Sequence, residues 1–112
     1  MVEQKRESFR VEFPRTYYPT INIQGEEFEV FDASEFGIRF YADTTKSEFI
    51  PGATFQAVIT FTDNEQFKLT TEVVRVENRF ISIKLLTPLP LSRIRAEHLA
   101  LIQRFSEKKA YS

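Results

Sequence analysis

Residues 54–76 decide the fold, and they read TFQAVITFTDNEQFKLTTEVVRV. In the first part of this stretch, apolar side chains stand at every second position: Phe55, Ala57, Ile59 and Phe61. Successive side chains of a strand point to opposite faces, so these four share one face. Residues 62–65 are turn formers, and the alternation resumes from Phe67. The stretch therefore predicts a β-hairpin with one buried face.

Shorter runs of the same kind lie on both sides of this hairpin. Apolar residues alternate with polar ones over residues 27–31, 37–41 and 80–86. Pro51-Gly52 and Asn78 mark turns between these runs, since Pro presets φ and Gly accepts positive φ. The pattern is typical of an all-β domain of about six strands.

The C-terminal end has a different period. After Pro90, a stripe of side chains recurs at offsets of four, three and four: Ile94, His98, Leu101 and Phe105. This spacing predicts an amphipathic helix over residues 91–106, with Ser92 as a plausible N-cap. One face of the helix should lie on the sheet, and the whole predicts a small barrel with a helical lid.

Length and composition limit the class of protein. The chain has 112 residues, 42% of them hydrophobic, with 12 Phe, 4 Tyr, no Cys and a net charge of −1. These values predict one folded domain, exclude a disulfide framework, and disfavour a general DNA or RNA binder. Apolar runs reach only about four residues, and no apolar segment follows the N-terminus, so we expect a cytoplasmic domain without membrane insertion.

Residues suited to catalysis are few. His98 is the only histidine, and we expect it to pack on the helix stripe and not to bind a metal. The three glycines are too far apart for a phosphate-binding loop: Gly25, Gly37 and Gly52. We expect the acidic run around Glu27 to lie on the solvent face of a strand. The sequence predicts no enzyme, no metal and no cofactor.

Two short motifs do indicate a ligand. The first, KRESFR over residues 5–10, has an RxxxR spacing that places Arg6 and Arg10 on a mobile arm before the first strand. Arginine forks bind phosphate oxygens or the O6 and N7 atoms of guanine, and they stack on bases. The spacing is a weak signal, because Arg75 and Arg79 share it.

The second motif is DASEFG over residues 32–37, a DxSxxG spacing between two apolar runs. Asp32 and Ser34 should point the same way, where the carboxylate can accept hydrogen bonds from N1–H and the amine of guanine. Gly37 would permit a tight turn or a close approach of the backbone to a ligand. The pattern arises by chance in about 1% of such chains, although a simple Asx or Ser turn would explain it too.

Together and in this order, the two motifs resemble the PilZ domain family of bacterial cyclic di-GMP receptors. The resemblance covers residues 4–106 and implies a six-stranded antiparallel Greek-key barrel with the helix packed across it. It implies domain limits of 1–10 for the arm, 11–90 for the barrel and 91–106 for the helix. The chain departs from the family pattern in one place. In the family, the late strand often has a glycine before its last apolar pair. This chain reads FISI over residues 80–83, which we expect to affect barrel shape more than the ligand.

The resemblance also implies the binding residues. Arg6 and Arg10 would bind phosphates and guanine edges or stack on a base, Asp32 and Ser34 would hydrogen-bond a guanine, and Gly37 would keep the turn tight. Secondary candidates are Lys5 and Arg75. The ligand would order the arm and change a surface that an unidentified protein effector reads. One bound ligand and a stacked pair both stay open.

Two other functions are compatible with the residues. The first is a protein-interaction adaptor that has this fold and ignores nucleotide. The second is a single-strand nucleic-acid binder of the OB type, with Tyr17 and Tyr18 as stacking platforms. In a barrel this rich in Phe, we expect the two tyrosines to pack, and the slight acidic excess disfavours the second alternative.

Overall fold

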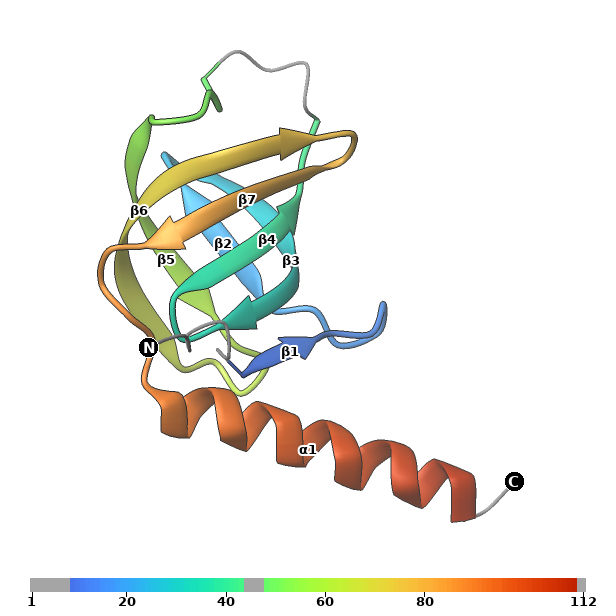
Figure 1. Cartoon of the computed structure of the whole chain (residues 1–112). Coiled ribbons are helices and arrows are strands. Elements are labelled where there is room, and N and C mark those ends of the chain that lie inside the picture. The colour runs from blue at the N-terminus through green and yellow to red at the C-terminus, as the bar shows by residue number, and fades with distance from the viewer. Residues whose placement is uncertain (1–8, 44–47, 111–112) are drawn as a thin grey trace, which may run out of the picture.

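A computed structural model describes residues 9–43 and 48–110, with side chains described as far as residue 104. Seven strands and one helix follow one another along these residues (Figure 1). They are β1 (Arg10–Glu12), β2 (Thr20–Ile23), β3 (Glu26–Ser34), β4 (Gly37–Tyr41), β5 (Thr54–Thr60), β6 (Gln66–Glu77), β7 (Phe80–Leu85) and α1 (Leu91–Ala110).

Six of these strands close into a barrel. Each of β2 to β7 pairs with two neighbours, in the cyclic order β2, β3, β4, β7, β6, β5, and every pairing is antiparallel. Residues 42–53 connect β4 to β5, which do not pair with each other, so the connections are those of a Greek key. The predicted six-stranded antiparallel barrel is confirmed.

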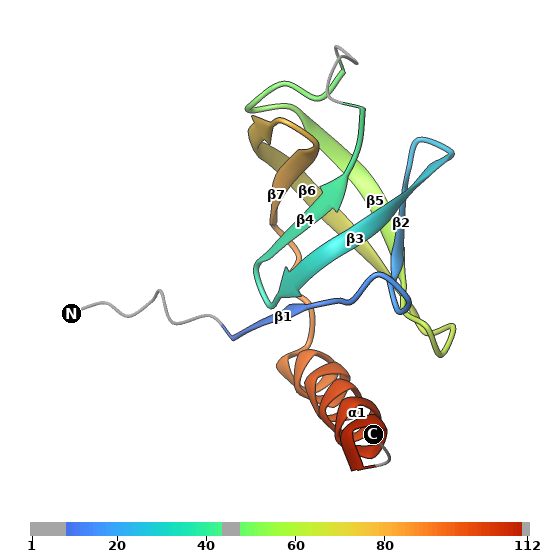
Figure 2. The ribbon, with the colours of Figure 1, turned by 90° about the vertical axis from the view of Figure 1, so that its right-hand side faces the viewer.

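The strand β1 is an addition to this barrel. It pairs with β3, beyond the point where β3 pairs with β2, and it lies along the outside of the barrel end (Figure 2). The sequence placed Arg10 in the N-terminal arm, whereas in the structure Arg10 begins β1. The strands β1 and β2 have three and four residues, too few for alternation to reveal them.

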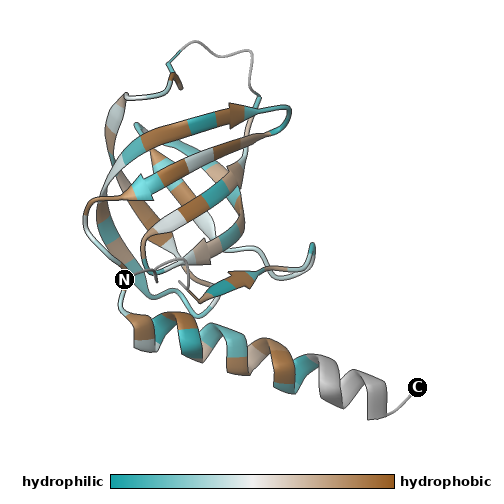
Figure 3. Ribbon diagram, viewed as in Figure 1, coloured by the Kyte–Doolittle hydropathy of each residue, from teal (hydrophilic) through white to brown (hydrophobic). Residues whose placement is uncertain are grey.

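Hydrophobic and hydrophilic residues alternate along the strands, as the brown and teal bands in Figure 3 show, and the inward-facing hydrophobic side chains form the core. The predicted inward face of β5 is buried at Ala57 and Ile59, and the inward face of β6 at Leu69 and Val73. The larger of these side chains, Ile59, Leu69 and Val73, each contribute roughly 1.5–3 kcal/mol by leaving water. The Glu27 and Glu29 side chains point outward and are exposed, as expected for a solvent face.

Two β-bulges shift the outward-facing side chains. In β3, Val30 lies opposite Phe40 and Asp32 lies opposite Arg39, so Phe31 is the extra residue. In β6, the register shifts between Val73 and Arg75. Bulges of this kind re-aim side chains and raise the local twist. The first bulge lies on the strand that leads into the predicted ligand-binding turn.

The helix α1 lies across one end of the barrel and contacts β1 and β3 (Figure 1). The Pro90 carbonyl accepts the first hydrogen bonds, from the Arg93 and Ile94 amides, so Ser92 lies inside the helix and is not its N-cap. The helix continues past residue 106 to Ala110, because residues 107–110 contain neither Gly nor Pro. In the described part of the chain, no helix is long and apolar enough to cross a membrane.

Charged residues fix the orientation of α1. Arg93 donates hydrogen bonds to Asp63 at 2.9 Å and Glu65 at 2.6 Å, both on the β5–β6 hairpin, and it also pairs with Glu97 one turn along. Its guanidinium lies over the Phe61 ring, 4.5 Å from the centroid. Burial opposes the charge, yet the hydrogen bonds to Asp63 and Glu65 raise the pKa of Arg93 above its ordinary value. The hairpin and the helix are therefore held as one unit.

Candidate functional site

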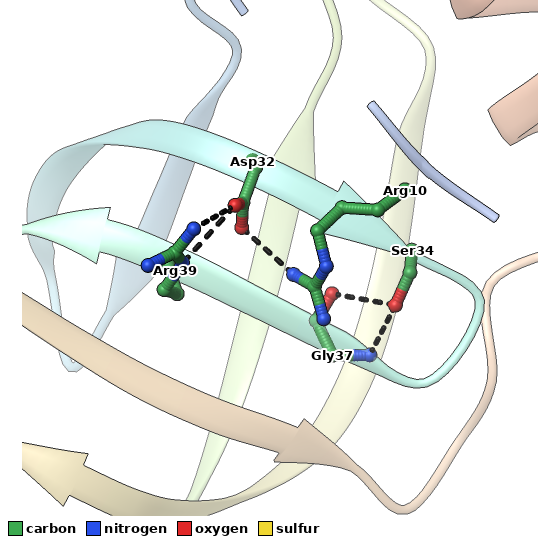
Figure 4. Close-up of polar contacts among 5 residues, drawn as sticks. All are labelled: Arg10, Asp32, Ser34, Gly37 and Arg39. Carbon is green, nitrogen blue, oxygen red and sulfur yellow. Dashed lines mark hydrogen bonds and ion pairs between the residues drawn. The ribbon is translucent and has the colours of Figure 1, made fainter. Parts of the chain in front are cut away.

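The DxSxxG residues form the turn between β3 and β4. The Ser34 hydroxyl accepts a hydrogen bond from the Gly37 amide at 3.1 Å and donates one to the Gly37 carbonyl at 3.3 Å (Figure 4). Ser34 is buried, so its hydroxyl already braces the turn in the absence of any ligand. A Ser turn, one of the alternatives that the sequence left open, is therefore present.

Gly37 begins β4, directly beside Ser34 and Arg10. Its φ is not in the left-handed region, so the backbone does not require glycine here. A Cβ at this position would stand 3.7 Å from Arg10 Nη2 and 3.8 Å from Ser34 Oγ. These distances, with 3.5 Å to the Ile83 carbonyl oxygen, are ordinary van der Waals contacts, so the close approach of a ligand to Gly37 stays a prediction.

Asp32 lies two residues before Ser34 and points to the same outer face of β3, as the spacing predicted (Figure 4). Its side chain has no exposed surface. The Oδ1 atom accepts a hydrogen bond from Arg10 Nη1 at 2.8 Å. A buried carboxylate needs such partners, because burying an unpaired charge is strongly unfavourable.

Arg10 reaches Asp32 from the added strand β1. Arg10 lies opposite Ser34 in the register, and the next residue, Val11, is buried opposite Ala33. The Val11 side chain points into the core, so that of Arg10 points outward over the turn. The structure thus brings Arg10, Asp32, Ser34 and Gly37 together from segments separated by 22 residues.

Arg39 is a site residue that the sequence analysis missed. Its Nε and Nη2 atoms both donate to Asp32 Oδ2, at 3.0 and 2.6 Å. The hydrogen bond to Asp32 is the main cause that raises the pKa of Arg39, against the opposing effect of burial. The sequence contained one indication of this position. Arg39 comes two residues after Gly37, so the two residues lie on the same face of the strand.

A surface pocket of about 330 Å³ opens beside this pair. It lies over three neighbouring strands, since Ser82 of β7 is opposite both Arg39 of β4 and Arg75 of β6. Its lining includes three arginines, a glycine and a bulged valine: Arg10, Arg39, Arg75, Gly37 and Val74. The volume is at the lower end of the range for ligand pockets, about 300–1,000 Å³.

The charge of this pocket differs from that of the whole chain. All three of its arginines pair with carboxylates: Arg10 and Arg39 with the buried Asp32, and Arg75 with Glu77 at 3.4 Å. The guanidinium groups themselves line the opening. An anion with planar groups suits such a surface, because guanidinium binds phosphate and stacks on rings.

Ser82 belongs to the FISI segment, residues 80–83, in which the resemblance led us to note a missing glycine. The pairing of β7 with β4 runs through Ser82 without a shift in register, and Ser82 lines the pocket. The expectation that this departure affects barrel shape more than the ligand stays a prediction, although the regular pairing shows no distortion of the strand at this residue. The residue lies between two arginines of the candidate site.

The remaining candidates fall into two groups. Lys5 and Arg6 lie outside the described residues. Tyr17 and Tyr18 are partly buried against the core, and the guanidinium of Arg104 lies over the Tyr17 ring, 4.8 Å from its centroid. This packing removes the best support for the single-strand nucleic-acid binder.

A larger hollow, of about 540 Å³, lies at the opposite end of β4. Its lining is Tyr41, Ala42, Asp43, Asn78 and Arg79. It contains one arginine and one carboxylate side chain, so it lacks the concentration of guanidinium groups found beside Gly37. The three arginines that line the smaller pocket favour it as the candidate site.

Fold and candidate site together define a small β-barrel with an arginine-lined pocket on its outer face. The family model for the PilZ domain matches residues 4–106. The chain therefore belongs to the PilZ domain family, a family of binding domains and not of enzymes. A search of curated proteins gives no significant match.

Solved structures with the same fold include three bacterial proteins. YcgR of Escherichia coli, in complex with c-di-GMP, superposes with a TM-score of 0.71 at 18% identity, over 96% of this chain and 50% of that one. The inhibitor of motility MotI/DgrA of Bacillus subtilis gives 0.70 at 17%, over 88% and 53%. MrkH of K. pneumonia, also with c-di-GMP, gives 0.66 at 18%, over 96% and 57%. The chain thus spans about half the length of each.

Proposed function

We propose that this chain is a receptor domain for cyclic di-GMP in bacterial second-messenger signalling. The observation that carries the proposal is the pocket lined by Arg10, Arg39 and Arg75, of which Arg10 and Arg39 also hold the buried carboxylate of Asp32. Cyclic di-GMP offers two phosphates and two guanines, which match guanidinium donors and a carboxylate acceptor. Family membership and the ligand-bound YcgR and MrkH structures support the same ligand.

The roles of the residues follow from their chemistry. Arg10, with Arg6 of the preceding segment, binds phosphate oxygens and guanine edges, and Asp32 accepts hydrogen bonds from N1–H and the exocyclic amine of a guanine. Ser34 and Gly37 keep the turn tight and leave room for the ligand. Lys5 and Arg75 contribute further positive charge.

Binding transmits a change by ordering the arm that carries Arg6. Phe9 precedes Arg10 and packs against His98 of α1, with ring centroids 4.8 Å apart. A shift of Arg10 toward the ligand would therefore reach α1, and the altered surface acts on a protein partner. In this mechanism, amide exchange at residues 4–8 slows when the ligand is saturating, and unchanged exchange would contradict it.

Calorimetric titration of cyclic di-GMP into the purified chain tests the ligand, with GTP as a control nucleotide. We expect saturable binding that Arg10→Ala weakens by about tenfold or more, because a charged hydrogen bond is lost. The matched control is Arg79→Ala, an exposed arginine outside the pocket, which should bind as the wild type does.

Absence of binding by the folded wild-type chain would contradict the receptor function. In that case the nucleotide-independent adaptor becomes the better description, since it requires only the barrel. Equal weakening by Arg10→Ala and Arg79→Ala would indicate general attraction between charges and no defined site.

A further inference from the structure

Asp32 cannot accept a hydrogen bond from a guanine in the arrangement that the structure shows. Its side chain has no exposed surface, and both oxygens already accept hydrogen bonds, Oδ1 from Arg10 and Oδ2 from Arg39. One arginine must therefore leave before a guanine can reach the carboxylate. The site is closed by its own side chains.

The two arginines are held very differently. Arg10 makes one hydrogen bond to Asp32, its side chain is 43% exposed, and it lies on a three-residue strand paired with β3 alone. Arg39 makes two hydrogen bonds, its side chain is 34% exposed, and its strand pairs on both sides. Arg10 is thus the easier of the two to displace.

Aromatic rings add a second constraint on Arg39. Its guanidinium carbon lies 5.0 Å from the centroid of Phe31 and 5.8 Å from that of Phe80, and those two rings are 5.0 Å apart. A cation over such rings is attracted by their electron-rich faces. The bulge in β3 that places Phe31 here also turns Asp32 toward Arg39.

We propose that Arg39 is the fixed positioning residue of the cyclic di-GMP site, and that Arg10 is the exchangeable one. The proposal rests on the proposed function. A guanine displaces Arg10 from Asp32 Oδ1, and Arg10 turns to the ligand, while Arg39 keeps its pair with Oδ2. The carboxylate then stays neutralised throughout, which removes the penalty of a lone buried charge.

The same residue supplies a flat surface to the ligand. The exposed part of Arg39 lines the pocket, next to Gly37 and Ser82. A guanidinium that is already fixed at its edge by Asp32 loses little freedom when a base stacks on it. Lysine keeps the charge but has neither the planar surface nor the paired donors, so it should not replace Arg39.

The test is made on the whole chain with cyclic di-GMP as the ligand. In a nitrogen-15 spectrum, we expect the Nε–H signal of Arg39 to stay protected from solvent exchange in the free and the saturated protein, while the side-chain signals of Arg10 move. Calorimetry should show Arg39→Lys binding at least about tenfold more weakly, whereas Arg79→Lys binds as the wild type does.

Each outcome decides between the two proposals. A wild-type chain that binds no cyclic di-GMP overturns both. Wild-type binding with equal affinity in Arg39→Lys overturns the role of Arg39 alone. Loss of protection at Arg39 Nε on saturation, with Arg10 unchanged, reverses the assignment of fixed and exchangeable residues. The spectrum needs no variant, so a misfolded Arg39→Lys leaves the decision intact.

Discussion

The side chain of Asp32 links the stability of the barrel to its candidate binding surface. It is fully buried on the outer face of β3, between an arginine of β1 and an arginine of β4. Coulombic interaction with Glu12 and Glu77 also favours the charge on Arg39. A change at this single carboxylate should therefore affect both folding and binding.

Replacing Asp32 by Asn should destabilise the fold. The amide keeps the shape but removes the charge that two arginines face, and breaking a buried pair costs about 3–5 kcal/mol. Since both arginines keep some contact with water, we expect the lower end of that range, measured by urea unfolding. Glu29→Gln, on the same strand but exposed, should change the free energy of unfolding by less than about 0.5 kcal/mol. Equal effects of the two changes would contradict this role of Asp32.

Tyr41 predicts a pH dependence of stability. Burial, followed by the hydrogen bond with Tyr18, raises the pKa of Tyr41 from 10.0 to about 12. A raised pKa stabilises the folded state fully below pH 10, and this stabilisation is lost as the pH rises through 12. We expect the free energy of unfolding to fall across that window, and Tyr41→Phe to remove part of the fall. An unchanged pH profile in Tyr41→Phe would show that other groups cause it.

The sequence predicted the site residues that belong to regular patterns. Asp32 and Ser34 share a strand face because they are two apart, and the structure places Arg10 beside them. Spacing puts Arg39 on the same strand face as Gly37, but its pairing with Asp32 could not be predicted, because it depends on a bulge in β3 that leaves no periodic signal. The ligand contacts of these residues stay predictions.

Among the elements, the longer strands and the helix were predictable and the short strands were not. The strands β5 and β6 bury a clean alternating face, which residues 54–76 display directly. The helix was visible from its stripe, but Glu97, which is buried on that stripe, was not expected. The burial of a glutamate can be predicted from sequence only if its partner, here Arg93, is recognised as well.

The anchor of α1 should be a strong determinant of stability. Replacing Arg93 by Met leaves Glu97 buried without its partner and removes the contacts to the β5–β6 hairpin. We expect a loss of about 3–5 kcal/mol in the free energy of unfolding, measured in urea. Arg95→Met, at an exposed position of the same helix, is the matched control. A loss of less than about 1 kcal/mol in Arg93→Met would show that the cluster contributes little.

Taken as one domain, the barrel keeps its core and its candidate ligand surface apart. The core side chains fill the interior, while the arginines lie on the outer face of β1, β4 and β6. Substitutions in the pocket can therefore alter binding without opening a cavity. This separation explains how the barrel can be shared with structures that are only 17–18% identical.

Ligand binding should stabilise the entire chain. A ligand that binds only the folded state adds about 2.7 kcal/mol at a concentration one hundred times its Kd. We expect cyclic di-GMP to raise Tm by several degrees in thermal unfolding, and Arg10→Ala, with binding about tenfold weaker or more, to lose about half of that rise or more at the same ligand concentration. An equal rise in both proteins would place the ligand away from Arg10.

The most direct test of the receptor function is a map of backbone amide shifts in the nitrogen-15 spectrum as cyclic di-GMP is added. We predict that the largest shifts cluster at residues 10, 32–39, 75 and 82, on the outer face beside the β3–β4 turn. Shifts that cluster instead around the hollow at Tyr41 and Arg79, or no shifts at saturating ligand, would contradict the account.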